Sequence, residues 1–389
     1  MDRFDVVVIG GGIHGVGAAQ AAAAAGFSVL LLEKNHLAYG SSSRSSKLIH
    51  GGLRYLESGQ FSLVYECLHE RHLLTRLAPD LVYLDRFYIP VYDSTSRSRV
   101  TLRTGLSLYA ALGGLHAASR FKTLAKKQWP SLDGLKLQGM KAVYQYFDGR
   151  TDDVALTAAV MRSAAELGAE SIVPAEFISA ECEQDKVHIA YTVNGIKKHC
   201  EAKALVNASG AWINPVLEKI RPARSVRPVD LVQGTHLLLD NLAINHCFYL
   251  EAPQDKRAIF LLPWKNKTLL GTTETLFSGQ ADNVLPLQSE QDYLLEVVQH
   301  YFPCYFSGRH VISVVDKFAG LRVLPTGEGD DFSKPRDTVL YQSHDRVINV
   351  YGGKLTTYRL TAQRIMKKLQ AVLPVREVKA VTHKIKLQG

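Results

Sequence analysis

The chain has 389 residues, of which 46% are hydrophobic and 21% charged, so it is an ordinary globular protein with enough length for two domains. The formal net charge of +9 favours an anionic ligand, an anionic membrane surface or nucleic acid as a partner. The five cysteines are odd in number and contain no Cys-x-x-Cys pair, which excludes a disulfide framework or a zinc site and fits a reducing compartment.

The first ten residues, MDRFDVVVIG, place acidic side chains where an export signal would have basic ones. We therefore predict no signal peptide and a cytoplasmic protein. The most apolar stretch, residues 15–32, has the length to raise the question of a membrane span. Its alanine-rich first half and the break at residues 26–28 instead predict a helix, a turn and a strand.

The N-terminal segment carries a dinucleotide-binding pattern. Residues 4–9 predict a buried parallel strand, and residues 29–32 predict a second one that ends at Glu33. Between them an alanine-rich helix follows three glycines in the G-x-G-x-x-G arrangement, namely Gly10, Gly12 and Gly15. The glycines let the backbone approach a pyrophosphate, the helix N-terminus offers free N–H groups, and Glu33 accepts from a ribose. The alternative is a tight strand-to-helix turn without a ligand.

Two later segments repeat the pattern of a strand that runs into a glycine turn. These segments are KALVNASGAW at residues 203–212 and VINVYGGKLTTYR at residues 347–359, the latter followed by a helix through Lys368. A nicotinamide enzyme would add further strand–helix units directly after Glu33, whereas this chain enters a serine-rich loop. Three such elements spread along the chain suit a long cofactor that is contacted at several points, so we predict FAD.

The remaining patterns predict an α/β fold with an α+β cap. Residues 151–170 predict a helix of the FAD-binding domain, and the runs RAIFLLPW and KTLLGTT predict an antiparallel sheet that forms the floor of a substrate pocket. We expect a discontinuous FAD-binding, Rossmann-like domain made of residues 1–60, 150–215 and 335–389. Residues 61–149 and 216–334 then form the substrate or cap domain.

The loop SSSRSSKLIHGGLRYLE, residues 41–57, makes the sequence recognisable. With the glycine fingerprint before it and YGGKLTTYR after it, the chain resembles the flavin-dependent glycerol-3-phosphate dehydrogenases. VNASGAW, the segment from LLPW to LLGTTE, and FAGLRVLP extend the resemblance over nearly the whole chain. Two features depart from the family: Glu274 stands where an aspartate is usual, and members continue past the position of Gly389 as a helical C-terminal domain.

The resemblance implies a fold similar to glycine oxidase and D-amino-acid oxidase, and non-covalent FAD. It further implies oxidation of sn-glycerol 3-phosphate to dihydroxyacetone phosphate, with hydride transfer to flavin N5 and electrons passed to a quinone. Two alternatives remain open, a related FAD-dependent oxidoreductase acting on another small hydroxy or amino acid, and a flavin-binding protein without turnover. The residues assigned to the cofactor are Gly10, Gly12, Gly15, Glu33, Lys34, Ser42, Ser45, Ser46, Leu48, Ala208, Gly210, Trp212, Gly353, Lys354, Leu355 and Thr356.

The catalytic candidates are cations, histidines and one phenol. Four cations match family positions that could neutralise a phosphate group of the substrate, namely Arg54, Arg322, Arg336 and Lys354. Tyr55 directly follows Arg54 in the loop. An alcohol is a poor acid, so its oxidation needs a base, for which His50 and His236 are the candidates. The competing account lets Arg322 polarise the hydroxyl. We expect Gly51 and Gly52 to let the backbone pass close to the flavin, and we expect no metal.

Residues 97–129 contain seven lysines and arginines, no acidic residue, and interleaved leucine, tyrosine and phenylalanine. This composition fits peripheral contact with anionic lipid on the cytoplasmic face of the inner membrane. It fits a solvated face of the cap domain equally well, and both interpretations stay open. We expect no nucleic-acid partner, because no recognition motif accompanies the charge.

Overall fold

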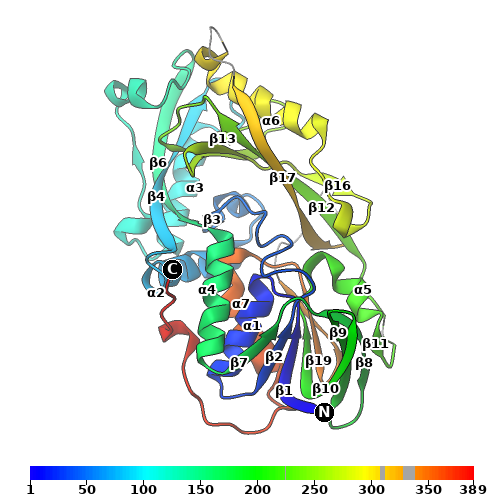
Figure 1. Ribbon diagram of the computed structural model, residues 1–389. Helices are drawn as coiled ribbons and strands as arrows, with labels where there is room; N and C mark the ends of the chain where they lie inside the picture. Colours follow the sequence, from blue (N-terminus) through cyan, green and yellow to red (C-terminus); the bar gives the residue numbers. More distant parts are fainter. Residues whose placement is uncertain (224, 307–311, 327–337) are drawn as a thin grey trace.

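Two β-sheets form the architecture, and each combines strands that are far apart in the sequence (Figure 1). The computed structural model describes residues 1–223, 225–306, 312–326 and 338–389. The first sheet has the order β11-β8-β9-β10-β1-β2-β7, with β19 paired to β10 and β18 to β19. Its strands are β1 (Asp2–Ile9), β2 (Val29–Leu32), β7 (Ala169–Ile172), β8 (Glu176–Cys182), β9 (Val187–Val193), β10 (Ile196–Asn207), β11 (Ile220–Arg221), β18 (Val339–His344) and β19 (Val347–Tyr351).

The second sheet has the order β16-β12-β15-β14-β13-β4-β6-β3, with β17 paired to β12 and β5 to β6. Its strands are β3 (Leu48–Ile49), β4 (Val82–Tyr92), β5 (Lys122–Thr123), β6 (Met140–Thr151), β12 (Val229–Asp240), β13 (Cys247–Glu251), β14 (Ala258–Trp264), β15 (Lys267–Gly271), β16 (Thr275–Phe277) and β17 (Ser313–Pro325). The runs RAIFLLPW and KTLLGTT form β14 and β15, which pair in antiparallel register as predicted.

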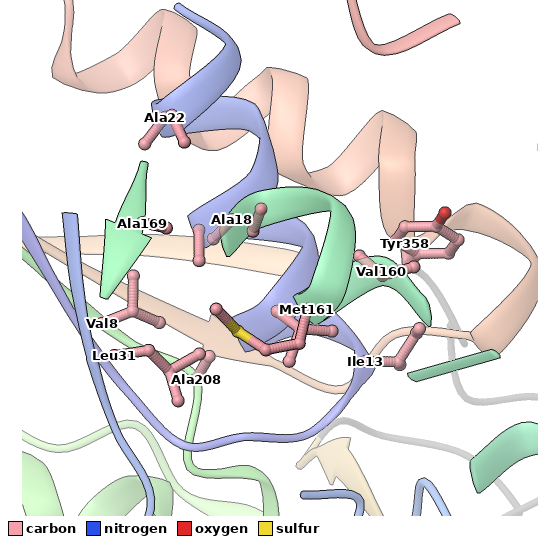
Figure 2. Packing of buried hydrophobic residues seen from close by; sticks show 14 of the residues in the cluster. Val8, Ile13, Ala18, Ala22, Leu31, Val160, Met161, Ala169, Ala208 and Tyr358 are labelled. Atoms are coloured by element: carbon pink, nitrogen blue, oxygen red, sulfur yellow. The ribbon is translucent and has the colours of Figure 1, made fainter. Parts of the chain in front are cut away.

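The helices are α1 (Ile13–Ala24), α2 (Phe61–Leu77), α3 (Arg99–Leu112), α4 (Asp153–Glu166), α5 (Ile213–Leu217), α6 (Gln288–Tyr301) and α7 (Tyr358–Leu369). Helix α1 is buried on nearly all sides, since α4 and α7 flank it on one face of the first sheet (Figure 1). Figure 2 shows Ala18 and Ala22 of α1 in the core with Val160 and Met161 of α4 and Tyr358 of α7. The alanine run therefore serves close packing between helices rather than a membrane. In the described part of the chain no helix is long and apolar enough to cross a bilayer.

Three parallel strands bring the three glycine turns to one edge of the first sheet. β10 lies between β1 and β19, with Asn207 opposite both Ile9 and Asn349. The side chains of Asn207 and Asn349 are also joined by a hydrogen bond of 2.9 Å. Because all three strands end at this edge, the turns at Gly10, Gly210 and Gly353 are neighbours although hundreds of residues separate them. Ligands of open parallel sheets bind outside such carboxyl ends.

The predicted helix at residues 151–170 is too long. The structure ends α4 at Glu166, and residues 169–172 form β7, which pairs in parallel with β2. Gly168 has a φ of +97°, a left-handed conformation that stops the helix and sends the chain into the sheet. At the other end Asp152 caps the helix by accepting from the N–H groups of Val154 and Ala155.

We propose that each sheet marks one domain, with residues 1–60, 150–215 and 335–389 forming the FAD-binding part. Eight strands of the first sheet start and end within these segments. Two short strands cross the proposed boundaries, because β3 pairs in the second sheet and β11 in the first. Residues 327–337, at the junction near 335, lie outside the described part of the chain.

Candidate active site

A cavity of about 440 Å³ is lined by residues of both sheets and of the loop at residues 39–55. Of the residues predicted to bind the cofactor, all but Gly15 line this cavity. Gly15 has another role, because a Cβ there would lie 1.8 Å from the carbonyl oxygen of Gly10 and would push α1 off the turn. The predicted catalytic residues His50, Arg54, Tyr55, His236, Arg322 and Lys354 also line it, and Arg336 lies outside the described residues.

The glycine turn is held by Glu33. One carboxylate oxygen accepts from the N–H of Gly11 at 2.7 Å and the other from the N–H of Asn35, also at 2.7 Å. Gly10 has a φ of +105°, and a Cβ at this position would lie 2.6 Å from the carbonyl oxygen of Ala208. Glu33 thus organises the first turn, and its remaining lone pairs can accept from a ribose. α1 has no acidic side chain in its first turn, so its positive end stays available to a phosphate.

The serine loop is fixed by bonds to both halves of the molecule. Ser42 Oγ accepts from the N–H of Ile13 at 2.9 Å, which leaves its own hydroxyl proton free to donate. Ser45 Oγ donates to Asp153 at 2.6 Å, and Ser46 Oγ shares a 2.8 Å hydrogen bond with Nε2 of His236. We predict that these hydroxyls serve the cofactor; all three already have a protein partner, and Ser42 keeps its hydroxyl proton free to donate.

Gly51 and Gly52 have structural reasons to be glycine, and their close approach to the flavin stays a prediction. A Cβ at Gly51 would lie 2.3 Å from the hydroxyl of Tyr109 and 2.4 Å from Leu68, which are protein atoms. Gly52 has a φ of +76°, and a Cβ there would collide with the ring of Tyr55. Packing and backbone conformation therefore require both glycines, irrespective of any approach to the flavin.

Arg54 and Arg322 meet on one carboxylate. Their guanidinium groups donate to the same oxygen of Glu274, at 3.1 Å and 3.0 Å, and Arg322 also donates to Oγ1 of Thr272. Burial alone would lower the pKa of Arg54, but Tyr55 and Glu274 outweigh it and raise the pKa above its usual value. Both arginines are thus charged and fixed in position at the cavity wall.

Tyr55 joins this group to Lys354. The ammonium of Lys354 lies 3.7 Å from the centroid of the Tyr55 ring and has no hydrogen-bond partner among the described residues. The guanidinium carbon of Arg54 lies 5.4 Å from the same centroid. Since Arg54 and Tyr55 belong to the short 3-10 helix at Leu53–Leu56 and Lys354 follows β19, the site joins two distant segments.

The two histidines have different surroundings. His236 is buried, stacks on Phe318 with ring centroids 5.0 Å apart, and has an Nδ1 without a hydrogen-bond partner in the described structure. Burial, with the nearby charges of Arg322 and Lys47, lowers the pKa of His236 well below its usual value. His50 is half-buried and lies near Tyr55 and Phe260 at the cavity wall.

Lys34 and Trp212, two residues assigned to the cofactor, line the cavity but also bind carboxylates of the protein. Lys34 is exposed and pairs with Glu176 at 3.1 Å, and the indole N–H of Trp212 donates to Asp282 at 3.1 Å. Sequence reasoning missed several lining residues, among them His14, Tyr39, Tyr146, Tyr249 and Phe260. His14 stands at a variable position of the glycine motif, and Tyr39 lies in the loop after β2. The other three aromatic residues lie on strands whose cavity-facing side no motif marks. The described residues contain no cluster of three or more His, Cys, Asp or Glu side chains able to hold a metal.

The glycine turn, the acid at the end of β2 and the cavity lined by both sheets define an oxidoreductase that uses a dinucleotide cofactor. The sequence matches the model of the FAD dependent oxidoreductase family over residues 5–365. The chain belongs to this family, and its cofactor is FAD. The residues present fit that group, because the N-terminal end of α1, which has no acidic side chain in its first turn, and three glycine turns open onto one cavity.

Similar proteins include a D-erythritol 1-phosphate dehydrogenase of Brucella abortus, 36% identical over 96% of this chain and 75% of the relative. An aerobic glycerol-3-phosphate dehydrogenase of Staphylococcus aureus is 34% identical over 94% of this chain and 66% of that protein. Among solved structures, the glycerol-3-phosphate dehydrogenase of Bacillus halodurans in complex with FAD has a TM-score of 0.78 at 26% identity, covering 99% of this chain and 68% of its own. Glycine oxidase of Geobacillus kaustophilus has a TM-score of 0.73 at 18% identity over 100% and 99% of the chains, which confirms the predicted fold.

Proposed function

We propose that the protein oxidises the secondary alcohol of a small polyol phosphate, with sn-glycerol 3-phosphate as the leading substrate and dihydroxyacetone phosphate as its product. The observation that carries this proposal is the group of cations Arg54, Arg322 and Lys354 on the cavity wall, with both arginines bound to Glu274. Three cations and one carboxylate leave two formal positive charges, which match the charge of a phosphate dianion. Guanidinium groups bind phosphate through paired N–H donors.

Glu274 adds a second feature that supports a polyol. Its carboxylate accepts from both arginines, so part of their charge is already neutralised. Glu274 does not line the cavity itself, but its charge next to the two arginines disfavours a second anionic group on the ligand by repulsion. A ligand with a single phosphate and otherwise uncharged hydroxyl groups meets this requirement.

Oxidation removes a proton from the hydroxyl oxygen and a hydride from the carbon, and the carbonyl forms between these atoms. FAD, when bound, would supply the hydride acceptor, and we infer a quinone as the final electron acceptor. We assign His50 as the base, because the lowered pKa makes His236 a poor proton acceptor near neutral pH. In this proposal His236 orients Ser46, while Arg322 stabilises the charge that develops on the hydroxyl oxygen.

We further propose a cytoplasmic enzyme that reaches its quinone through peripheral contact with an anionic membrane. The support is the basic segment at residues 97–129, in which Arg99, Arg103, Arg120, Lys122, Lys126 and Lys127 are exposed. Arg97 is different, because Glu57 and Glu251 bind it. A relative named as an aerobic glycerol-3-phosphate dehydrogenase is compatible with electron transfer to a respiratory acceptor.

D-Erythritol 1-phosphate is the second candidate substrate, favoured by the 36% identity to the Brucella abortus enzyme. It carries the same phosphate and secondary alcohol on a longer chain. The other two candidates are an FAD-dependent oxidoreductase of a hydroxy or amino acid and a flavin-binding protein without turnover. Glycine oxidase and amino-acid oxidases share the fold, but their identities of 14–18% carry no substrate information.

Anaerobic mixing of the FAD-loaded protein with single substrates tests this proposal. We expect sn-glycerol 3-phosphate at millimolar concentration or below to bleach the yellow flavin within seconds, and glycerol without the phosphate to leave it unchanged. Faster bleaching by D-erythritol 1-phosphate would identify the longer polyol phosphate as the substrate. Bleaching only by an amino acid or an unphosphorylated hydroxy acid would refute the proposal, as would a flavin that none of these compounds reduces.

A further inference from the structure

His14 is a half-buried side chain whose two ring nitrogens are buried, and no motif assigns it to the site. It is the second residue of α1 and stands between Gly12 and Gly15 of the first glycine turn. It lines the cavity, and its ring lies against the third turn, because a Cβ at Gly353 would be 2.2 Å from Nε2 of His14. The imidazole thus sits where the first and third turns meet.

The ring has the chemistry of a binding group but no binding partner in the protein. Nδ1 and Nε2 are both buried, and neither has a hydrogen-bond partner within the described ranges. Buried polar atoms in folded proteins nearly always have a partner, because leaving one unsatisfied destabilises the fold. Gln20, one and a half turns further along α1, follows this rule by donating to Oγ of Ser163 at 2.9 Å.

We propose that His14 is a cofactor-binding residue whose neutral imidazole hydrogen-bonds to a hydroxyl group of the bound FAD. The cavity is where a partner can be supplied, since the ring already packs on Gly353. Rotation about the Cβ–Cγ bond changes which ring atoms face the cavity. A hydroxyl both donates and accepts, and so does a neutral imidazole. Burial lowers the pKa of His14 to about 4, which keeps the ring neutral at physiological pH.

This inference concerns FAD alone and does not depend on the proposed substrate. If sn-glycerol 3-phosphate proves not to be the substrate, the role of His14 is unaffected. Conversely, a failure of the His14 test leaves the polyol phosphate proposal intact, because that test uses no substrate.

The test compares FAD affinity and thermal stability in three variants of the whole chain. His14→Leu removes both polar atoms, His14→Asn keeps one donor and one acceptor on a shorter side chain, and Gln20→Leu is the matched control on the same helix. The Kd for FAD is measured by fluorescence on titration, and Tm is measured over a range of added FAD. We expect His14→Leu to raise the Kd about fivefold, the usual effect of losing a neutral hydrogen bond. His14→Asn should raise it less.

The stability data separate a cofactor contact from a structural role. Without added FAD, His14→Leu should melt no lower than the parent, since the imidazole has no protein partner to lose, whereas its stabilisation by FAD should shrink. Gln20→Leu should lose stability at every FAD concentration and keep the parent Kd. A His14→Leu variant that binds FAD with the parent Kd overturns the inference. If that variant does not fold, His14→Asn decides, and an unchanged Kd in it has the same consequence.

Discussion

At the scale of single residues, the two arginines on Glu274 carry the substrate assignment. Arg54 and Arg322 reach the same carboxylate oxygen from segments more than 260 residues apart in sequence, at 3.1 Å and 3.0 Å. Each variant Arg54→Ala and Arg322→Ala should lose about 2–4 kcal/mol of transition-state stabilisation. That corresponds to a fall in kcat/KM for sn-glycerol 3-phosphate of roughly thirtyfold to a thousandfold. Lysine at either position should restore little, because it keeps the charge but lacks the planar pair of donors.

Arg257 provides the control for this prediction. Its guanidinium donates to the backbone carbonyl of Glu274 at 2.7 Å, but it does not line the cavity. Arg257→Ala should therefore disturb the same loop and keep kcat/KM within a few-fold of the parent. The flavin spectrum should stay that of the bound cofactor in all three variants. Near-parent rates in both Arg54→Ala and Arg322→Ala would show that the phosphate binds elsewhere.

Sequence patterns located most of the residues of the site but not their local partners. The motif spacing placed His50, Arg54, Tyr55, Arg322 and Lys354 correctly at one cavity. It gave no sign that Glu274 would bridge the arginines, because that bridge requires the end of β15 and the strand β17 to lie side by side with β12. The sequence patterns did not identify His14 for a related reason. A variable position in a glycine motif says nothing about a ring that packs on a turn more than 300 residues later.

At the scale of elements, the serine loop is anchored to the start of α4. Asp153 is fully buried and accepts from Nζ of Lys47 at 2.7 Å and from the backbone and hydroxyl of Ser45. Lys47 itself has a φ of +59°, so the loop is held in a backbone conformation that residues other than glycine rarely adopt. Because Ser46 and the residues after it run along the cavity, this anchor fixes one wall of the site.

Neutralising Asp153 should therefore destabilise the protein strongly. Asp153→Asn leaves the buried ammonium of Lys47 without its counter-charge, a change that typically costs about 3–5 kcal/mol. The neighbouring Asp152→Asn is the matched control. Asparagine caps a helix as well as aspartate does, and the ion pair of Asp152 with Lys265 is partly exposed to solvent, so its cost should stay below about 1 kcal/mol. Urea unfolding of the FAD-loaded proteins measures both, and equal losses would contradict the anchoring role.

The strands and turns were easier to predict than the ends of helices. β2 begins and ends at the predicted residues, since four apolar residues between a glycine break and an acid leave little choice. α4 was predicted to extend four residues beyond its C-terminal end, because alanine and glutamate favour a helix and only Gly168 marks its end. Whether residues 169–172 continue a helix or form a strand depends on the free edge of β2, which is a tertiary feature.

At the scale of the whole molecule, the two sheets carry separate parts of the site. The first sheet supplies the glycine turns, and the second supplies His236 from β12, Phe260 from β14 and Arg322 from β17. A buried ion pair between Glu70 of α2 and Arg359 of α7 links their surrounding helices. The sequence predicted two domains made of interleaved segments. The reason is that strands running into glycine turns alternate along the chain with the strand runs of the substrate or cap domain. It did not predict which residues of the second sheet would face the first.

The last prediction concerns the surface formed by α3 and the residues just after it, in the part of the molecule built on the second sheet. α3 buries Leu106, Tyr109 and Ala110 and leaves Val100 75% exposed, and Leu115 just after the helix is 58% exposed. Exposed apolar groups among exposed cations are what an anionic bilayer surface would bind. We expect the protein to sediment with vesicles that contain phosphatidylglycerol and not with vesicles of phosphatidylcholine alone, and the binding to weaken as salt is raised.

Charge reversal locates the binding face. Each basic residue near a lipid surface contributes about 1 kcal/mol, so the triple variant Arg103→Glu, Lys122→Glu, Lys126→Glu should bind anionic vesicles about a hundredfold more weakly. The control variant Lys197→Glu, Lys198→Glu, Lys368→Glu changes the net charge equally at exposed positions on β10 and α7. If the protein used its overall charge rather than this face, both variants would lose the same affinity. A protein that ignores anionic vesicles at low salt would leave residues 97–129 as a solvated surface and would remove the structural support for quinone access from the membrane.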